Sequence, residues 1–294
     1  MRAGPRKVVA LNNGDEIKRI QELEENKRLL AAQREMYSTA KRFDCANALV
    51  CFAGPLFVTL IQLVSAIPSG ALIAVWFLAM AAGLVLPGLS AGLVKKAAQV
   101  QQAFDSKAFG MPFENAGIGR GDVTRYADRY YARCERKGID PGLDDWYSVD
   151  LSGLEAGEAI ARCQRQNAEW TRRLLLRSIG GEVAAAAVFG ALLWSLVARL
   201  SVDPLSLTFL LSIVEWAIQR VARCLSTLRK VGNLSVSMSF DLSSEENVRR
   251  AQGAIYDYRS SSYIVSDLVY HLSKSGMMWL LQGIKISSRT EPQL

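Results

Sequence analysis

The longest uncharged stretch of the sequence runs from Cys45 to Val94, fifty consecutive residues without Asp, Glu, Lys or Arg. A helix rises about 1.5 Å per residue and the hydrocarbon core of a bilayer is about 30 Å thick, so one crossing needs roughly 20 apolar residues. The stretch is long enough for two crossings. A break between them is offered by Ile67-Pro68-Ser69-Gly70, because proline lacks a backbone donor and glycine tolerates many dihedral angles. The pattern therefore predicts a membrane hairpin.

Two further apolar segments predict a second hairpin. Span three is expected between Arg177 and Arg199, and span four between Asp203 and Arg220. Only sixteen positions, one of them Glu215, lie between Asp203 and Arg220, which corresponds to about 24 Å of helix. Because this is short, we expect Arg220 and Arg223 to extend toward the lipid headgroups, or the bilayer to thin locally.

Together these segments predict an all-α membrane protein with four transmembrane helices in two hairpins and a helical cytosolic region. Outside the spans, helices are expected over 15–42 with Asn13 as N-cap, over 123–137, from about residue 154 into span three, over 243–258 and over 263–281. The expected division is a cytosolic tail and helix (1–44), the first hairpin (45–95), a cytosolic insertion (96–175), the second hairpin (176–224) and a cytosolic C-terminal region (225–294).

The distribution of cations predicts the orientation. If four spans alternate, the loops near Ser69 and near Val202 share one side of the membrane, and of 35 Lys and Arg residues only Arg199 lies near it. Cytoplasmic loops carry the excess of Lys and Arg. We therefore expect both termini and the insertion in the cytoplasm.

The polar residues do not form a recognisable catalytic or metal site. The five cysteines show no CxxC spacing, and His271 is the single histidine, so no zinc set, no Cys-His pair and no Ser-His-Asp triad is expected. Asp144 and Asp145 are adjacent carboxylates on a turn, which are more often solvated or capping than catalytic. We expect reduced structural thiols, no cofactor and no enzymatic activity.

Polar residues inside the predicted spans suggest a pore, because a polar stripe within lipid has to face protein or water. Glu215 is a carboxylate at bilayer depth, and such a residue marks an ion path or a paired site. An equally open interpretation is a buried packing face, in which Glu215 hydrogen-bonds Gln62. The candidate pore-lining residues are Thr59, Gln62, Thr208, Ser212, Glu215 and Gln219.

Two cytosolic segments have chemistry suited to a nucleotide. Gly117-x-Gly119-x-Gly121 with Arg120 and Arg125 offers backbone amides and guanidinium groups to phosphates, although the pattern favours an ordinary loop. The segment 163–167 with Trp170 mixes amide and guanidinium donors with an aromatic face. The alternative for this segment is a juxtamembrane helix whose Trp170 and arginines meet lipid headgroups.

Three blocks of the sequence resemble a known family. They are Leu29-Leu30-Ala31-Ala32-Gln33-Arg34-Glu35-Met36-Tyr37 with Ala40-Lys41-Arg42, then Asp145-Trp146-Tyr147-Ser148, and then Cys163-Gln164-Arg165-Gln166-Asn167 with Trp170. In order and spacing they resemble the bacterial SMODS-associating four-transmembrane effector family.

The resemblance implies a membrane effector of cyclic-oligonucleotide anti-phage signalling (CBASS). A partner nucleotidyltransferase makes a cyclic nucleotide on infection, and the effector, as an expected homo-oligomer among membrane lipids, permeabilises the inner membrane. The expected contacts to the cyclic oligonucleotide are Arg120, Arg125, Trp146, Tyr147, Gln164, Arg165, Asn167 and Trp170. The alternative function is a constitutive membrane scaffold or small transporter whose cytosolic region docks a partner protein.

Overall fold

The computed structural model describes residues 11–64, 69–112, 119–200, 204–237, 245–261 and 263–265. Within these ranges, the side chains at positions 52–64, 69–73, 196–200 and 204–215 are among those left undescribed. All regular secondary structure of the described residues is helical, which confirms the all-α prediction. The helices are α1 (Gly14–Gln21), α2 (Glu24–Val64), α3 (Ser69–Phe109), α4 (Arg120–Lys137), α5 (Ala156–Leu200), α6 (Pro204–Ser237) and α7 (Glu245–Arg259).

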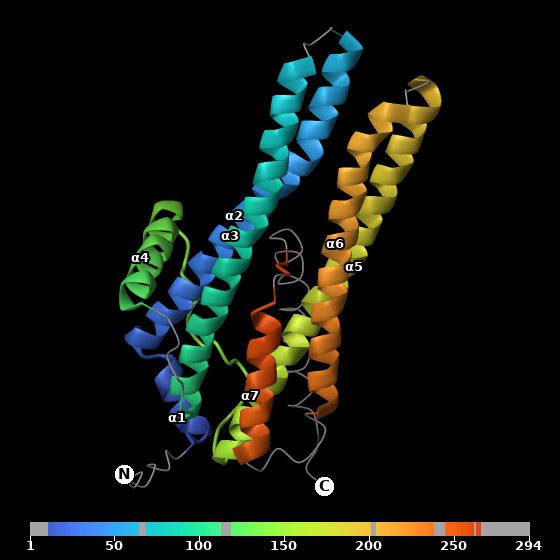
Figure 1. The fold of residues 1–294 in the computed structure, drawn as a ribbon. Coiled ribbons are helices and arrows are strands. Elements are labelled where there is room, and N and C mark those ends of the chain that lie inside the picture. Colours follow the sequence, from blue (N-terminus) through green and yellow to red (C-terminus); the bar gives the residue numbers. More distant parts are fainter. Residues whose placement is uncertain are drawn as a thin grey trace, which may run out of the picture.

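The four long helices form two antiparallel pairs, α2 with α3 and α5 with α6 (Figure 1). In the figure both pairs rise from a common base, where α1, α4 and α7 lie. Helix α4 packs along α2, and α7 lies between α3 and the α5–α6 pair. The two predicted hairpins are therefore present as helix pairs, and we call the remainder of the structure the body.

The long helices run without interruption from the body into the hairpins. Helix α2 continues through Arg42, where the sequence-based helix was expected to end, and α6 continues to Ser237. The predicted helix end at Arg42 was wrong, because a helical segment that has one buried face in the body needs no break before it enters an apolar stretch. Helix α5 confirms the predicted continuity into span three.

The first helix is shorter than expected. Its start is as predicted, since Asn13 Oδ1 accepts a hydrogen bond from the Glu16 amide at 2.9 Å. It ends at Gln21, and the buried Asn26 side chain donates to the Ile20 carbonyl at 2.8 Å. The predicted helix over 15–42 is therefore split in two, because a side-chain amide satisfies a carbonyl that a continuous helix would have used.

Glycine is required at the start of α1. The Gly14 amide donates to the Leu154 carbonyl at 3.0 Å, and a Cβ atom on Gly14 would lie 1.9 Å from the Leu151 carbonyl oxygen. This contact brings α1 against the segment that precedes α5.

The C-terminal helix predicted over 263–281 is not supported at its start, because residues 263–265 are not helical. Residues 266–281 lie outside the described part of the chain. Ser243, the expected first residue of the preceding helix, also lies outside it, and α7 is described from Glu245.

The main hydrophobic core lies in the body. Phe104 and Phe109 of α3 lie against Tyr147, with ring centroids 6.2 and 5.4 Å apart, and Leu30 and Ile160 are fully buried in the same cluster. Among the described residues, no helix contains a segment both long and apolar enough to cross a bilayer.

Candidate functional site at the junction of the two hairpins

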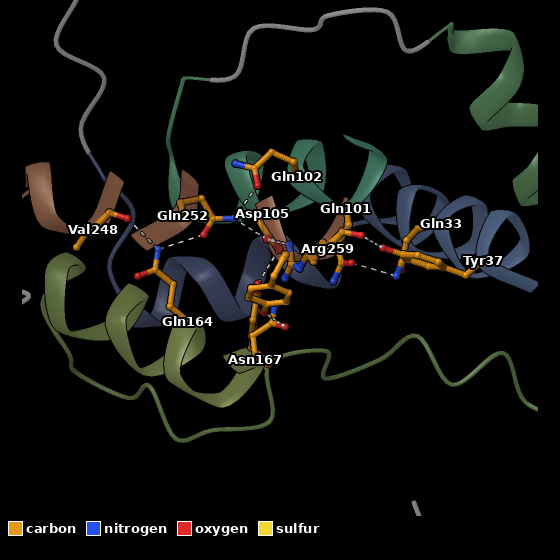
Figure 2. A network of polar contacts seen from close by, with 12 residues as sticks. Gln33, Tyr37, Gln101, Gln102, Asp105, Gln164, Asn167, Val248, Gln252 and Arg259 are labelled. Atoms are coloured by element: carbon orange, nitrogen blue, oxygen red, sulfur yellow. Dashed lines mark hydrogen bonds and ion pairs between the residues drawn. The ribbon is translucent and has the colours of Figure 1, made fainter. Parts of the chain in front are cut away.

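A buried carboxylate on α3 is the centre of a polar network in the body (Figure 2). Asp105 is buried. One carboxylate oxygen accepts from the Tyr147 hydroxyl at 2.6 Å, and the other accepts from Gln252 Nε2 at 2.8 Å and pairs with Arg259 Nη1. Burying an acid is unfavourable unless it is paired and hydrogen-bonded, and this one has three donors.

The cation of this pair belongs to α7. The Arg259 side chain is 5% exposed and that of Asp105 is 1% exposed, so the ion pair is almost completely removed from water. Burial alone would lower the pKa of Arg259, but Asp105, Tyr258 and Tyr147 raise it, and the net direction is upward. The guanidinium therefore keeps its charge. Its Nη2 atom has no hydrogen-bond partner among the described residues.

Amide side chains extend the network from α3 to α5 and α7. Gln164 Nε2 donates to Gln252 Oε1 at 3.1 Å and to the Val248 carbonyl at 3.0 Å (Figure 2). Gln252 Nε2 donates in turn to Gln102 Oε1 at 2.9 Å as well as to Asp105. Gln164 Oε1 is buried without a partner among the described residues.

Two tyrosines complete the attachment of α7. The Tyr258 hydroxyl donates to Asn167 Oδ1 of α5 at 3.2 Å, and the Tyr37 hydroxyl of α2 lies 3.5 Å from the Arg259 carbonyl oxygen. Burial raises the pKa of both hydroxyls, so they stay protonated and act as donors. Helix α7 is thus bound to α2, α3 and α5, which belong to both hairpins.

Three residues expected to contact a ligand lie in this network, namely Tyr147, Gln164 and Asn167. Burial raises the pKa of Tyr147 well above its usual range. Its neighbour Trp146 is partly buried edge-on against Phe104, with ring centroids 6.2 Å apart, and the Arg34 guanidinium lies 5.3 Å from the Trp146 ring centroid.

The other expected ligand contacts do not lie in the network. Arg120 and Arg125 lie at the start of α4 and are exposed, and Arg125 pairs with Asp122 at 2.7 Å. Arg165 is exposed on α5, and Trp170 is partly buried one and a half turns further along the same helix. The structure therefore separates the eight predicted residues into a buried group and a surface group.

The pore prediction falls mainly on undescribed side chains. Thr59 and Gln62 lie on α2, and Thr208, Ser212 and Glu215 lie on α6, but their side chains are outside the described residues. Gln219 is exposed on α6, and its carbonyl oxygen accepts from Arg223 Nε at 3.4 Å. Pore lining stays a prediction.

The adjacent carboxylates are paired with lysines. Asp144 pairs with Lys27, which lowers the pKa of the carboxyl, and Asp145 accepts from Lys18 at 2.6 Å. Both carboxylates are largely exposed. The described residues contain no group of His, Cys, Asp or Glu arranged to hold a metal ion, and the cysteines are free thiols.

Asp105, Gln252 and Arg259 were not predicted as site residues. The signal for Asp105 was present, since it lies on the same helical face as Ala98, Gln101 and Ala108, and all four are buried. A carboxylate on a face of small and amide side chains needs a partner. That the partner is Arg259, 154 positions away, follows only from the packing of α7.

One comparison with known proteins gives a match. The model of the SMODS-associating 4TM effector domain matches residues 15–278, which is nearly the whole chain. No curated protein and no solved structure matches. The matched range includes both hairpins, α7 and the buried network. The chain therefore belongs to the family of SMODS-associating 4TM effector domains.

Proposed function

We propose that this protein is the membrane-acting effector of a CBASS system, and that it permeabilises the bacterial inner membrane when its cytosolic body binds a cyclic oligonucleotide. The family name associates the chain with SMODS nucleotidyltransferases and describes an effector, not a catalytic domain. Permeabilisation, ligand binding and assembly into an oligomer are the further steps of the proposal.

The observation that carries the proposal is the position of the exposed apolar side chains. Of the large apolar side chains that the structure describes as exposed, all but Leu23 and Ile139 lie on the hairpin helices. A concentration of exposed apolar side chains in one part of a protein is typical of contact with lipid or with other protein. The exposed residues on the hairpins are Leu49, Phe77, Leu78, Met80, Leu84, Val85, Leu89, Leu176, Val183, Val188, Trp194, Ile218 and Leu225.

Cations at the base of the hairpins support a cytoplasmic body. Lys95 and Lys96 are exposed directly after the uncharged stretch, and Arg42 is exposed shortly before it. Arg177 is exposed on α5 at the corresponding end of span three. Such residues interact favourably with anionic headgroups of the cytoplasmic leaflet. In this arrangement the body, the insertion and both termini lie in the cytoplasm.

The ligand acts in this proposal by changing how α7 is held. The exposed guanidinium groups of Arg120, Arg125 and Arg165 are suited to binding phosphates, and the partly buried indole of Trp170 is suited to stacking on a nucleobase. The buried group around Asp105 holds α7 between the hairpins. A ligand shifts the position of α7 only if it binds one arrangement more tightly than the other.

Reconstituted protein tests the proposal directly. Vesicles of phosphatidylethanolamine and phosphatidylglycerol, loaded with a self-quenching dye, are mixed with a panel of cyclic di- and trinucleotides. We expect one class of nucleotide to release the dye in proportion to protein, and linear dinucleotides to release none. Glu215→Ala and Gln62→Ala are expected to reduce the release, because they remove polar groups from the predicted pore face.

Expression in cells separates the proposal from a constitutive scaffold or transporter. The effector should be tolerated alone and lethal when an active nucleotidyltransferase is co-expressed, whereas a scaffold would be indifferent to that enzyme. Absence of dye release across the whole panel, together with absence of enzyme-dependent toxicity, would contradict the proposal.

A further inference from the structure

A second buried cluster of charges lies at the base of the hairpins, around Arg220 of α6. The sequence left two expectations for Arg220, extension toward the headgroups or local thinning of the bilayer, and the first is wrong, because the residue is 8% exposed. Its side chain instead points to acceptors within the protein. Nη1 pairs with Asp44, Nε donates to Glu182 Oε1 at 2.7 Å, and Nη2 donates to the Ile264 carbonyl at 3.3 Å.

Aromatic rings cover the same guanidinium. Its central carbon lies 5.5 Å from the ring centroid of Trp216 and 5.4 Å from that of Tyr263. The Tyr263 hydroxyl also donates to Glu182 Oε1 at 2.9 Å. Together with the contacts above, each of the three guanidinium nitrogens of Arg220 has an acceptor. We call Arg220, Asp44, Glu182, Tyr263 and Ile264 the Arg220 cluster.

The members of the Arg220 cluster come from different parts of the fold. Asp44 is the last residue of α2 before the uncharged stretch, so it belongs to the first hairpin. Glu182 of α5 and Arg220 of α6 belong to the second hairpin. Tyr263 and Ile264 follow α7. Hence the Arg220–Asp44 pair connects the two hairpins at their base.

The segment after α7 contacts both hairpins by packing as well. Tyr263 lies in a hydrophobic cluster with Leu175 and Cys224, on α5 and α6. The next residue, Ile264, lies in a cluster with Ala40 and Val94, on α2 and α3. Tyr263 therefore packs against the second hairpin and Ile264 against the first.

We propose that the Arg220 cluster is a lock that keeps the two hairpins together in the resting protein, and that the segment after α7 releases it. The inference rests on the proposed function, because it names the contact that permeabilisation has to break. Removing one partner of a buried pair leaves the other unpaired and destabilises the arrangement that buries it. When the hairpins separate, water hydrates the remaining charged group, so that group is less unfavourable in the separated state. Removal of one partner therefore favours separation.

The connection to the Asp105 network is short. Arg259, which pairs with Asp105, is four residues before Tyr263 in the chain. A displacement of α7 that breaks the Asp105 pair also withdraws Tyr263 and Ile264 from Arg220. Arg220 then keeps Asp44 and Glu182 as partners. The cluster loses the Ile264 carbonyl, which accepts from Arg220, and the Tyr263 hydroxyl, which donates to Glu182.

The first test measures dye release without nucleotide. Arg220→Gln is expected to raise the basal release rate of reconstituted protein by at least about tenfold, since the loss of a buried charge partner shifts a two-state equilibrium by at least that factor. Tyr263→Phe removes one hydrogen bond and is expected to give a smaller rise. Arg223→Gln, one turn away on α6, is the control and should leave the rate unchanged, because the Arg223 side chain donates to the Gln219 carbonyl of its own helix and not to the Arg220 cluster.

The second test removes the partner of Arg220 on the first hairpin and measures the hairpin separation. Asp44→Asn is expected to raise the basal rate as Arg220→Gln does, because either change removes the ion pair that connects the hairpins. Spin labels at the exposed positions Leu49 and Ile218, in a background without the native cysteines, report the distance between α2 and α6, which should increase in Arg220→Gln.

The outcomes separate the lock from the proposed function. If the wild-type protein responds to a nucleotide while Arg220→Gln shows neither basal release nor a longer label distance, the lock is wrong. If no nucleotide acts on the wild type but Arg220→Gln lengthens the distance, the lock stands and the proposed function is wrong. Should thermal unfolding show that Arg220→Gln does not fold, Tyr263→Phe decides, and an unchanged rate and distance in that variant overturn the lock.

Discussion

At the scale of single residues, substitution of Asp105 or Arg259 is expected to have the largest effect on the packing of α7. Their ion pair is almost fully buried, and Asp105 accepts two further hydrogen bonds from Tyr147 and Gln252. Such a pair is a modest source of net stability, because both groups lose hydration on folding. Its value is specificity, since α7 has one position in which all of these donors meet the carboxylate.

Arg259→Gln is expected to lower the free energy of unfolding by about 3 kcal/mol, because it leaves a buried carboxylate without its cation. Chemical denaturation in detergent, followed by circular dichroism, measures the change. Arg249→Gln on the same helix is the matched control. Its ion pair with Glu245 is substantially exposed, so its loss should change the free energy by less than about 0.5 kcal/mol. Equal effects of the two changes would contradict the assigned role of Arg259.

At the scale of elements, α7 has little stability of its own. It has fifteen residues, and a helix of this length is marginal in water without tertiary contacts. Its buried residues Val248, Ile255 and Tyr258 pack against the helices on either side. Because its position depends on these contacts and on Asp105, α7 is the element best suited to respond to a change in the body.

Helix α4 is expected to open independently of the long helices, because its main packing is along α2. It ends at Lys137 and is capped by Gly138, whose φ of 60° lies in the left-handed region. Gly138→Ala should therefore destabilise α4 locally by about 1 kcal/mol. Amide hydrogen exchange would measure this as about fivefold faster exchange in α4, with α2 unchanged.

The control for Gly138→Ala is Gly121→Ala, which is expected to change hydrogen exchange in α4 in the opposite direction. Gly121 lies inside the helix, and a Cβ atom there would meet nothing within 4 Å. Gly121→Ala should slow exchange in α4, because alanine loses less backbone entropy than glycine. Faster exchange in both variants would mean that α4 is held by contacts other than its own helical hydrogen bonds.

At the scale of the whole molecule, continuous helices join the body to the hairpins. Helix α2 has 41 residues and α5 has 45, so each spans both parts without a hinge loop. A rigid helix transmits a shift at its base to its far end. The Asp105 network and the Arg220 cluster both lie where such a shift would begin, and the short segment after α7 touches both hairpins.

Cysteine accessibility tests the orientation of the whole molecule. In a background without the native cysteines, Lys137→Cys at the end of α4 should be protected from a membrane-impermeant maleimide in intact cells. Ser201→Cys, between the helices of the second hairpin, should be labelled. We expect this because nearly all Lys and Arg lie on the side of the body. Labelling of Lys137→Cys in intact cells would place the body outside and remove the basis of the proposed function.

The sequence alone determined the helical class, the two hairpins and the family. These depend on local or linear properties, such as the uncharged stretch after Asp44, the break at Pro68, the cap at Asn13 and the order of three residue blocks. Tyr147, Gln164 and Asn167 were named from sequence as ligand contacts, because each lies in one of those blocks, and that role stays a prediction.

The tertiary structure decided which charges meet. Arg259 pairs with Asp105 across 154 positions, and Arg220 pairs with Asp44 across 176 positions. No local pattern encodes such pairs, because a helical face shows only that a charge will be buried, and the partner depends on how distant helices pack. The inward direction of Arg220 has the same cause. An isolated span would send this residue to the headgroups, and only the neighbouring helices and the segment after α7 offer it acceptors inside the protein.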